Sequence, residues 1–169
     1  MNRMSFWLLP PKLIQDQYQP IIDSWSRKLK TPRFEPHITL AFAGLLKGEA
    51  KSVLPIVEKV AKNLKPIPID FSKVSVSTTY YQCVFAQVKP NHELLRAHQL
   101  INSALRYHDP SMFVPHMSLV YGNLDLAQRF TVAAGVKLPV TEFLADRICV
   151  INADSLNPKT WQHLAEFEL

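Results

Sequence analysis

A pattern of seven residues occurs twice in this chain of 169 residues. Residues 34–40 and residues 113–119 both read Phe, any residue, Pro, His, apolar residue, hydroxyl residue, Leu, without a gap. The second copy begins 79 residues after the first. Such a repeat indicates a duplication inside one small unit, so the fold has to hold two equivalent segments in equivalent surroundings.

The sequence around the two copies repeats as well, in the order strand, helix, motif strand, helix, strand. We expect strands at about 6–9, 37–43, 67–77, 81–88, 116–121, 143–152 and 161–168, and helices between 14 and 29, 53 and 64, 94 and 105, and 124 and 134. This order predicts an α+β fold with two pseudo-symmetric lobes, each a mainly antiparallel sheet with outer helices, around a central cleft. The length is suited to one two-lobed catalytic domain that spans residues 1–169.

Each motif strand divides into a polar and an apolar face, because successive side chains of a strand point to opposite sides. His37 and Thr39 share one face, and His116 and Ser118 share the equivalent face of the second copy. The residues between and after them are apolar and are expected to face the core. If a pseudo-twofold axis relates the lobes, the two polar faces oppose each other, and the cleft holds two imidazoles and two hydroxyls.

These groups are suited to the hydrolysis of a cyclic phosphodiester. One imidazole, when neutral, accepts a proton from the attacking water, and the other, when protonated, donates a proton to the departing oxygen. The hydroxyls of Thr39 and Ser118 can donate hydrogen bonds to the non-bridging phosphate oxygens. The sequence shows no acidic cluster with metal-ligand spacing, so we expect no metal and no cofactor.

The doubled His-x-Thr/Ser motif resembles the signature of the two-histidine (2H) phosphoesterase superfamily. Residues 7–11, 81–85 and 119–122 are similar to segments of its small cyclic phosphodiesterase branch in fungi and plants. The resemblance implies opening of nucleoside 2′,3′-cyclic phosphates to 2′-phosphates, and of ADP-ribose 1″,2″-cyclic phosphate, a by-product of tRNA splicing, to ADP-ribose 1″-phosphate. It also implies that His37 and His116 are catalytic and that Thr39, Ser118 and Tyr121 bind phosphate. By analogy His116 is the base and His37 the acid.

Two other functions stay open. The first is a 2H enzyme that acts on RNA ends, such as an RNA 2′,3′-cyclic phosphodiesterase or a 2′-5′ ligase-like protein. The net charge of +5 and the pI of about 9.3 favour anionic partners in general. However, the motifs have few basic neighbours, with Arg33 near the first and Arg106 ten residues before the second, which favours a small nucleotide-type substrate. The second is a non-catalytic nucleotide- or RNA-binding module, against which the two intact motifs argue.

The remaining residues predict little chemistry. Cys83 and Cys149 lie in apolar runs and are interpreted as buried free thiols, with a disulfide left open, and they form no recognisable zinc site.

No stretch is long and apolar enough to span a membrane, so we expect a cytoplasmic monomer, or peripheral association with an internal compartment such as the Golgi. His98 is expected to pack within its helix, and the other histidines to be surface or structural residues. A nucleobase could stack on one of three aromatic side chains, for which core packing is the alternative: Trp7, Tyr80 and Tyr81.

Overall fold

The computed structural model describes residues 2–46, 50–107, 112–155 and 157–169. Within these residues the chain forms four α-helices and one sheet of eight strands, so the expected α+β class is confirmed. The strands are β1 (Asn2–Leu9), β2 (Ile38–Leu46), β3 (Ile67–Val76), β4 (Val84–Val88), β5 (His116–Val120), β6 (Glu142–Ala145), β7 (Arg147–Asn152) and β8 (Gln162–Glu168). The helices are α1 (Lys12–Leu29), α2 (Leu54–Ala61), α3 (His92–Ala104) and α4 (Leu126–Gly135), with short 3-10 helices at Ala50–Val53 and Pro158–Thr160.

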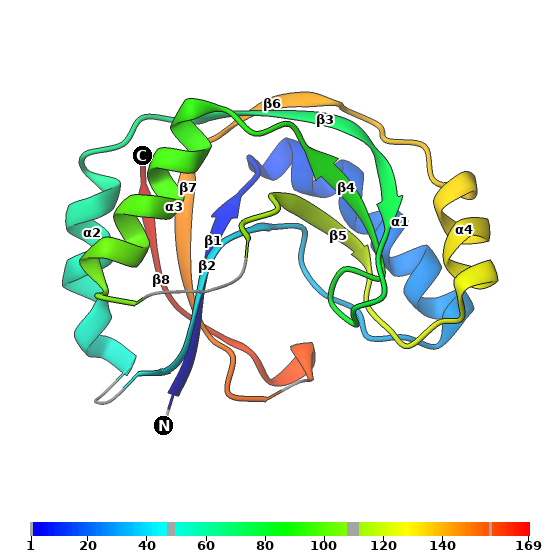
Figure 1. Cartoon of the computed structure of the whole chain (residues 1–169), viewed down its shortest axis with the longest axis horizontal. Helices are drawn as coiled ribbons and strands as arrows, with labels where there is room; N and C mark the ends of the chain where they lie inside the picture. The colour runs from blue at the N-terminus through cyan, green and yellow to red at the C-terminus, as the bar shows by residue number, and fades with distance from the viewer. Residues whose placement is uncertain (1, 47–49, 108–111, 156) are drawn as a thin grey trace.

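The sheet has two similar halves that meet at the motif strands. Its order is β6-β3-β4-β5-β2-β1-β7-β8, and every pairing is antiparallel. The central strands β2 and β5 are joined through the pair Ile38 and Met117, which occupy the same position in the two copies of the motif. The lobes are therefore halves of one sheet, whose curl from one half to the other can be followed in Figure 1.

The helices pack crosswise between the two halves. Helix α1 follows β1 but contacts β5, and α3 follows β4 but contacts β2. Helix α2 contacts β7 and β8, whereas α4 contacts β3 and β4, so each half carries two helices on its outer face (Figure 1). Within the described part of the chain, no helix has the length and apolar character needed to cross a bilayer.

Helix α1 forms as its spacing predicts, with Ile14, Tyr18 and Ile22 buried along one stripe. Pro20 neither starts nor ends the helix but lies inside it, on the exposed side. At that position the backbone carbonyl that proline leaves without a partner can reach water, which lowers the cost of the interruption. The helix ends at Lys30, which adopts a left-handed conformation with a φ of 55°.

The apolar face of each motif strand enters the core, as expected. Ile38, Leu40, Met117 and Leu119 are each at most 1% exposed, because the helices cover this side of the sheet. The alternation of the motifs then forces their polar side chains onto the concave face.

Two expected strands differ from the structure. The strand expected at 81–88 begins only at Val84, because residues 81–83 belong to a turn. The strand expected at 143–152 is divided at Asp146 into β6, which pairs with β3, and β7, which pairs with β1. The chain passes from one half of the sheet to the other at this residue, and apolar spacing carries no information about such a change of partner.

Candidate active site

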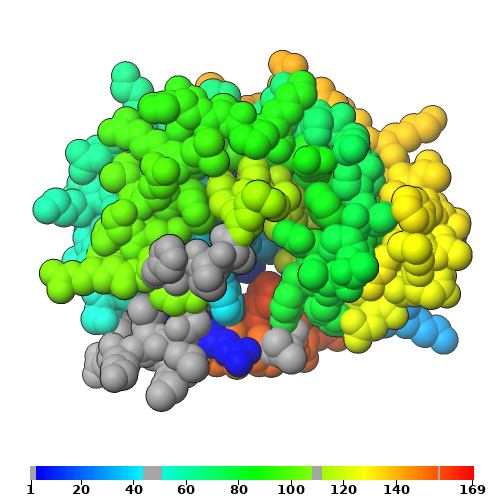
Figure 2. Space-filling model, viewed as in Figure 1, coloured from blue at the N-terminus to red at the C-terminus, as the bar shows by residue number. Residues whose placement is uncertain are grey.

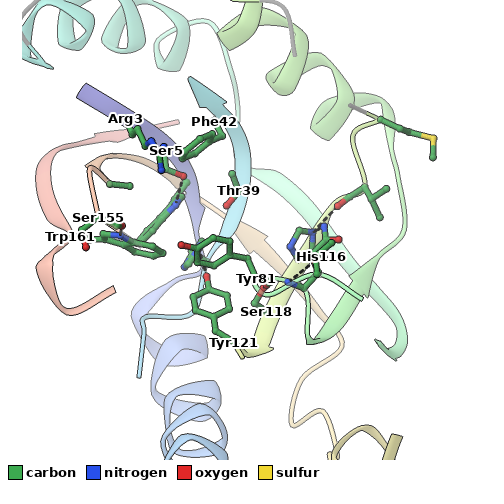
Figure 3. Close-up of a pocket in the computed structure, with 17 residues that line it drawn as sticks. Arg3, Ser5, Thr39, Phe42, Tyr81, His116, Ser118, Tyr121, Ser155 and Trp161 are labelled. Atoms are coloured by element: carbon green, nitrogen blue, oxygen red, sulfur yellow. Dashed lines mark hydrogen bonds between the residues drawn. The ribbon is translucent and has the colours of Figure 1, made fainter. Parts of the chain in front are cut away.

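The polar faces of the two motif strands line one cleft. Its volume is about 560 Å³, and both halves of the sheet contribute to it. Figure 2 shows the molecule hollowed near the middle of this face. His37, Thr39, His116, Ser118 and Tyr121 all line the cleft, so the structure brings together every site residue that the sequence predicted. In Figure 3, Trp161 and His116 lie on opposite sides of the cleft, with Tyr81 and Tyr121 between them.

Both imidazoles are oriented by the backbone in the same way. His37 Nδ1 lies 2.6 Å from the carbonyl oxygen of Glu35, and His116 Nδ1 lies 2.7 Å from that of Val114. A carbonyl oxygen can only accept a hydrogen bond, so each Nδ1 carries a hydrogen and donates it. In the neutral ring the lone pair is then on Nε2, which is the nitrogen available for proton transfer. The equivalence of the two carbonyls, each two residues before its histidine, follows from the internal repeat.

His37 lies in an almost closed aromatic cage. Its ring stacks on Trp7 with the centroids 3.6 Å apart, Phe34 meets it edge-on, and only 5% of the residue is exposed. Burial disfavours the charged imidazole and lowers the pKa of His37 to about 4, although the hydrogen bond to the Glu35 carbonyl and the Glu35 carboxylate both act in the opposite direction.

His116 has a less enclosed environment. The ring of Phe85 lies edge-on to it with the centroids 5.3 Å apart, and the side-chain amide of Gln82 lies 3.1 Å from its Nδ1. Burial lowers the pKa of His116 as well, and the hydrogen bond to the Val114 carbonyl acts against this effect. No carboxylate contributes to the pKa of His116, which distinguishes it from His37.

The three hydroxyl groups of the site, those of Ser118, Tyr121 and Thr39, differ in their hydrogen-bond partners. The Ser118 hydroxyl donates to the carbonyl oxygen of Tyr81 over 2.6 Å. The phenol oxygen of Tyr121 lies 3.4 Å from His37 Nε2, its ring stacks on Phe34, and burial raises the pKa of this phenol. Thr39 lines the cleft without a hydrogen-bond partner for its hydroxyl among the described residues, so it can donate to a bound anion.

A buried arginine, which sequence reasoning missed, holds the turn before β4. The side chain of Arg129 in α4 donates to the carbonyl oxygens of Leu124, Ser77 and Thr79, and the residue is 6% exposed. This turn carries Gln82 and the Tyr81 carbonyl into the site. The apolar spacing of α4 predicted the helix but not its inward side, since Arg129 is buried whereas Phe130 is 57% exposed.

The expectations for the aromatic residues divide. Trp7 packs against His37, is only 3% exposed and contributes to the wall of the cleft, whereas Tyr81 is half-buried and also lines the cleft. Tyr80 lines a separate shallow surface pocket instead. Sequence reasoning missed Trp161, which lines the cleft and lies 6.1 Å from the ring of Tyr81.

The two cysteines and the other described histidines mostly lie where the sequence predicts. Cys83 and Cys149 are free and buried, as interpreted. His98 stacks on Phe113 and its Nδ1 lies 2.6 Å from the Leu40 carbonyl oxygen, so it supports the motif strands. His108 lies outside the described residues. In the part of the chain that the structure describes, one group of side chains has metal-ligand geometry, and it lies outside the cleft: Cys149, His163 and Glu166.

Comparison with known proteins agrees with this architecture. A family model described as the 2′-5′ RNA ligase superfamily matches residues 10–157. A relative from Arabidopsis thaliana, called cyclic phosphodiesterase, is 25% identical and is aligned over 95% of this chain and 92% of its own length. A putative phosphoesterase of Geobacillus kaustophilus is 31% identical, over 66% of this chain and 65% of its own.

Solved structures show the same fold. LigT of E. coli, in a structure described as complexed with 3′-AMP, superposes with a TM-score of 0.68 at 16% identity, over 99% of this chain and 98% of that one. A structure described only as a phosphoesterase gives a TM-score of 0.70, also at 16% identity, over 100% and 99% of the two chains. The chain belongs to the 2′-5′ RNA ligase superfamily, the two-histidine phosphoesterases, and the resemblance found in the sequence is confirmed.

Proposed function

We propose that this protein is a cyclic phosphodiesterase that opens nucleoside 2′,3′-cyclic phosphates to nucleoside 2′-phosphates by acid–base catalysis between His37 and His116. The observation that carries the proposal is the matched orientation of the two imidazoles. Each is held at Nδ1 by a backbone carbonyl, which leaves Nε2 for proton transfer in a shared cleft. The Arabidopsis relative named cyclic phosphodiesterase supports the same reaction class.

The reaction exchanges one P–O bond for another. Water attacks the phosphorus opposite the 3′ oxygen and transfers a proton to Nε2 of His116. The bond between phosphorus and the 3′ oxygen breaks, and the proton on Nε2 of His37 passes to that oxygen. Each histidine ends in the opposite protonation state, and a proton exchange with solvent restores both. No bound metal takes part in this mechanism.

The assignment of acid and base rests on the one carboxylate that acts on only one of the two histidines, although the imidazole of His163 acts on His37 in the opposite direction. The Glu35 carboxylate raises the pKa of His37, whereas no carboxylate acts on His116. Burial is the larger effect at His37 and keeps it neutral in the free protein. The anionic phosphate adds a second negative charge next to the ring, and we propose that His37 takes up its proton together with the substrate.

The hydroxyls are proposed to hold the non-bridging oxygens. Thr39 is free to donate at once. Ser118 has to exchange its hydrogen bond to the Tyr81 carbonyl for one to the phosphate, and the resulting bond to an anion is stronger than the one it replaces. The Tyr121 phenol, protonated at all ordinary pH values because burial raises its pKa, donates beside His37.

The cleft is suited to a small nucleotide substrate. A volume of about 560 Å³ is within the range of pockets for small organic ligands, and Trp161 and Tyr81 offer aromatic rings at its side. Of the described residues, Arg3 is the one lysine or arginine that lines the cleft, and Arg33 is paired with Asp23 instead. A nucleic-acid strand would require more cationic groups than this. ADP-ribose 1″,2″-cyclic phosphate is proposed as a second substrate of the same monomeric, two-lobed unit.

A second candidate function is hydrolysis at RNA ends. The observation in its favour is the description of the matching family model as a 2′-5′ RNA ligase superfamily. This candidate reaction uses the same two histidines. It differs only in that the substrate is the end of an RNA strand, which would extend out of the cleft. Comparison of a mononucleotide with an oligonucleotide that ends in a 2′,3′-cyclic phosphate separates the two candidates, since the first predicts no gain in kcat/KM from the added strand.

The reaction is tested by phosphorus NMR of adenosine 2′,3′-cyclic phosphate incubated with the protein in excess chelator. We expect conversion to the 2′-phosphate and a loss of about 10²–10⁴-fold in rate for His37→Ala and for His116→Ala. His92→Ala is the matched control, because its side chain is 81% exposed and does not line the cleft, and it should retain the wild-type rate. Formation of the 3′-phosphate, or full dependence on added metal, would contradict the proposal.

A further inference from the structure

Three side chains converge on the concave face of the sheet outside the cleft. Cys149 in β7, and His163 and Glu166 in β8, place one sulfur, one nitrogen and one carboxylate oxygen within 4.8 Å of one another. Cys149 is buried, and the side chains of His163 and Glu166 are 43% and 39% exposed. The proposed reaction uses none of the three.

A β-bulge produces this arrangement. Residues three apart on a regular strand point to opposite faces, so His163 and Glu166 would normally be separated by the sheet. The register between β7 and β8 shifts by one residue, with Val150 opposite Ala165 but Ile151 opposite His163. The extra residue, Leu164, turns His163 to the face that already carries Cys149 and its direct partner Glu166.

Two of the three distances between the ligand atoms match those around a small tetrahedral cation, and the third is at most 4.8 Å. The Cys149 sulfur lies 3.3 Å from His163 Nδ1, and that nitrogen lies 3.6 Å from Glu166 Oε1. Zinc bonds of about 2.3 Å to sulfur and about 2.0–2.1 Å to nitrogen and oxygen, at tetrahedral angles, place neighbouring ligand atoms roughly 3.3–3.6 Å apart. The exposed side of the group leaves the fourth position to water.

The two exposed side chains, His163 and Glu166, are each oriented by a contact with another charged residue. Nε2 of His163 lies 2.8 Å from Glu35 Oε2, which leaves Nδ1 directed at the sulfur. Glu166 Oε2 accepts a hydrogen bond of 2.9 Å from Arg147 Nη1, which leaves Oε1 directed at His163. A carboxylate behind a ligating histidine, and a donor behind a ligating carboxylate, are the outer contacts that orient ligands in metal sites.

We propose that Cys149, His163 and Glu166 form a zinc site, with Glu35 and Arg147 as the residues that orient its ligands. A thiolate, an imidazole and a carboxylate together select a borderline-soft cation of the zinc type over magnesium or calcium. The site joins β7 to β8 at the edge of the sheet, beside Trp7, whose ring lies 6.0 Å from that of His163. None of the three zinc ligands takes part in the proposed phosphodiester chemistry, so zinc binding can be measured separately from turnover, although Glu35 is shared with the surroundings of His37.

The test is titration of the full, reduced and chelator-stripped protein with Co²⁺, followed by absorption spectroscopy. We expect one equivalent to bind, with a thiolate-to-cobalt charge-transfer band and the visible bands of tetrahedral cobalt, and displacement of both by one equivalent of Zn²⁺. Zinc should also raise the melting temperature, because the cation binds only the folded arrangement.

Matched variants identify the ligands. Cys149→Ser should lose the charge-transfer band, whereas Cys83→Ser, at the other buried cysteine, should keep it. Glu166→Gln should weaken binding while Glu168→Gln, two residues along the same strand, should not, and Glu35→Gln should weaken it about 10–100-fold. Because His163 and Glu166 are exposed, variants there should fold even if Cys149→Ser does not. Absence of the band in the wild type, or its persistence in Cys149→Ser, would overturn the proposal.

Discussion

At His37, the cost of burying a charge competes with the attraction of a nearby carboxylate. Burial is the larger effect, so the imidazole is neutral in the free protein even though Glu35 lies next to it. A group of this kind is a poor acid until an anion arrives and a capable one afterwards, since the phosphate then offsets the cost of burying the charge. In the proposed mechanism, burial between Trp7 and Phe34 links protonation of His37 to substrate binding.

The same burial makes a prediction about stability and pH. The unfolded chain protonates His37 near its ordinary pKa of about 6.5, whereas the folded protein does so only near 4. Between these values the unfolded state binds more protons, so the free energy of unfolding falls as the pH falls, by about 3 kcal/mol from this residue. The free energy of unfolding can be measured with urea at pH 7 and at pH 4. We expect it to fall between these pH values by about 3 kcal/mol less in His37→Gln than in the wild type.

His92→Gln provides the control for this measurement, because it removes an exposed imidazole and should leave the wild-type pH dependence unchanged. Contributions from His116 and His163 are common to all three proteins and cancel in the comparison. If His37→Gln and the wild type lost the same free energy between the two pH values, His37 would not be a desolvated, neutral imidazole.

At the scale of the elements, the motif strands were fully predictable. Their alternation of polar and apolar residues is a property of seven consecutive positions, and it placed the two histidines and two hydroxyls on one face. The cap of α3 was also predictable, because Asn91 accepts a hydrogen bond from the Leu94 backbone as asparagine commonly does at a helix start. These features depend on local sequence alone.

Contacts between distant segments could not be found in the same way. Arg129 reaches the turn before β4 across some fifty positions of sequence, and on a helical pattern it looks like an ordinary surface arginine. The group of Cys149, His163 and Glu166 was invisible for a similar reason, since a strand change and a bulge bring it together. His163 was expected to be a surface or structural residue, and its spacing from Cys149 matches no familiar ligand motif.

The role of Arg129 can be tested by Arg129→Met. This change leaves buried carbonyl oxygens without donors, so we expect a loss of about 3 kcal/mol in the free energy of unfolding. The turn that positions Gln82 and the Tyr81 carbonyl loosens as well, and kcat/KM should fall about 10–100-fold. Arg96→Met, at an exposed position on α3, is the control and should change neither quantity. Full activity in Arg129→Met would show that the turn does not depend on this side chain.

At the scale of the whole molecule, the duplication explains why the site is built from both halves of the sheet. Each half contributes one histidine held by a backbone carbonyl, and the halves meet at the pair Ile38 and Met117. Helices α1 and α3 each extend from one half onto the other, which ties the two together. Symmetry provides two equivalent imidazoles, and we propose that the difference between Glu35 in one copy and Val114 in the other gives them different roles.

The central claim is that one histidine removes a proton while the other supplies one to the departing 3′ oxygen. It is tested most directly with a nucleoside 2′,3′-cyclic phosphate in which sulfur replaces the bridging 3′ oxygen, because a departing thiolate needs no proton. We predict that His37→Ala recovers most of its lost rate with this substrate, whereas His116→Ala remains slow. Recovery by His116→Ala instead would reverse the two roles, and recovery by neither variant would contradict acid catalysis by these histidines.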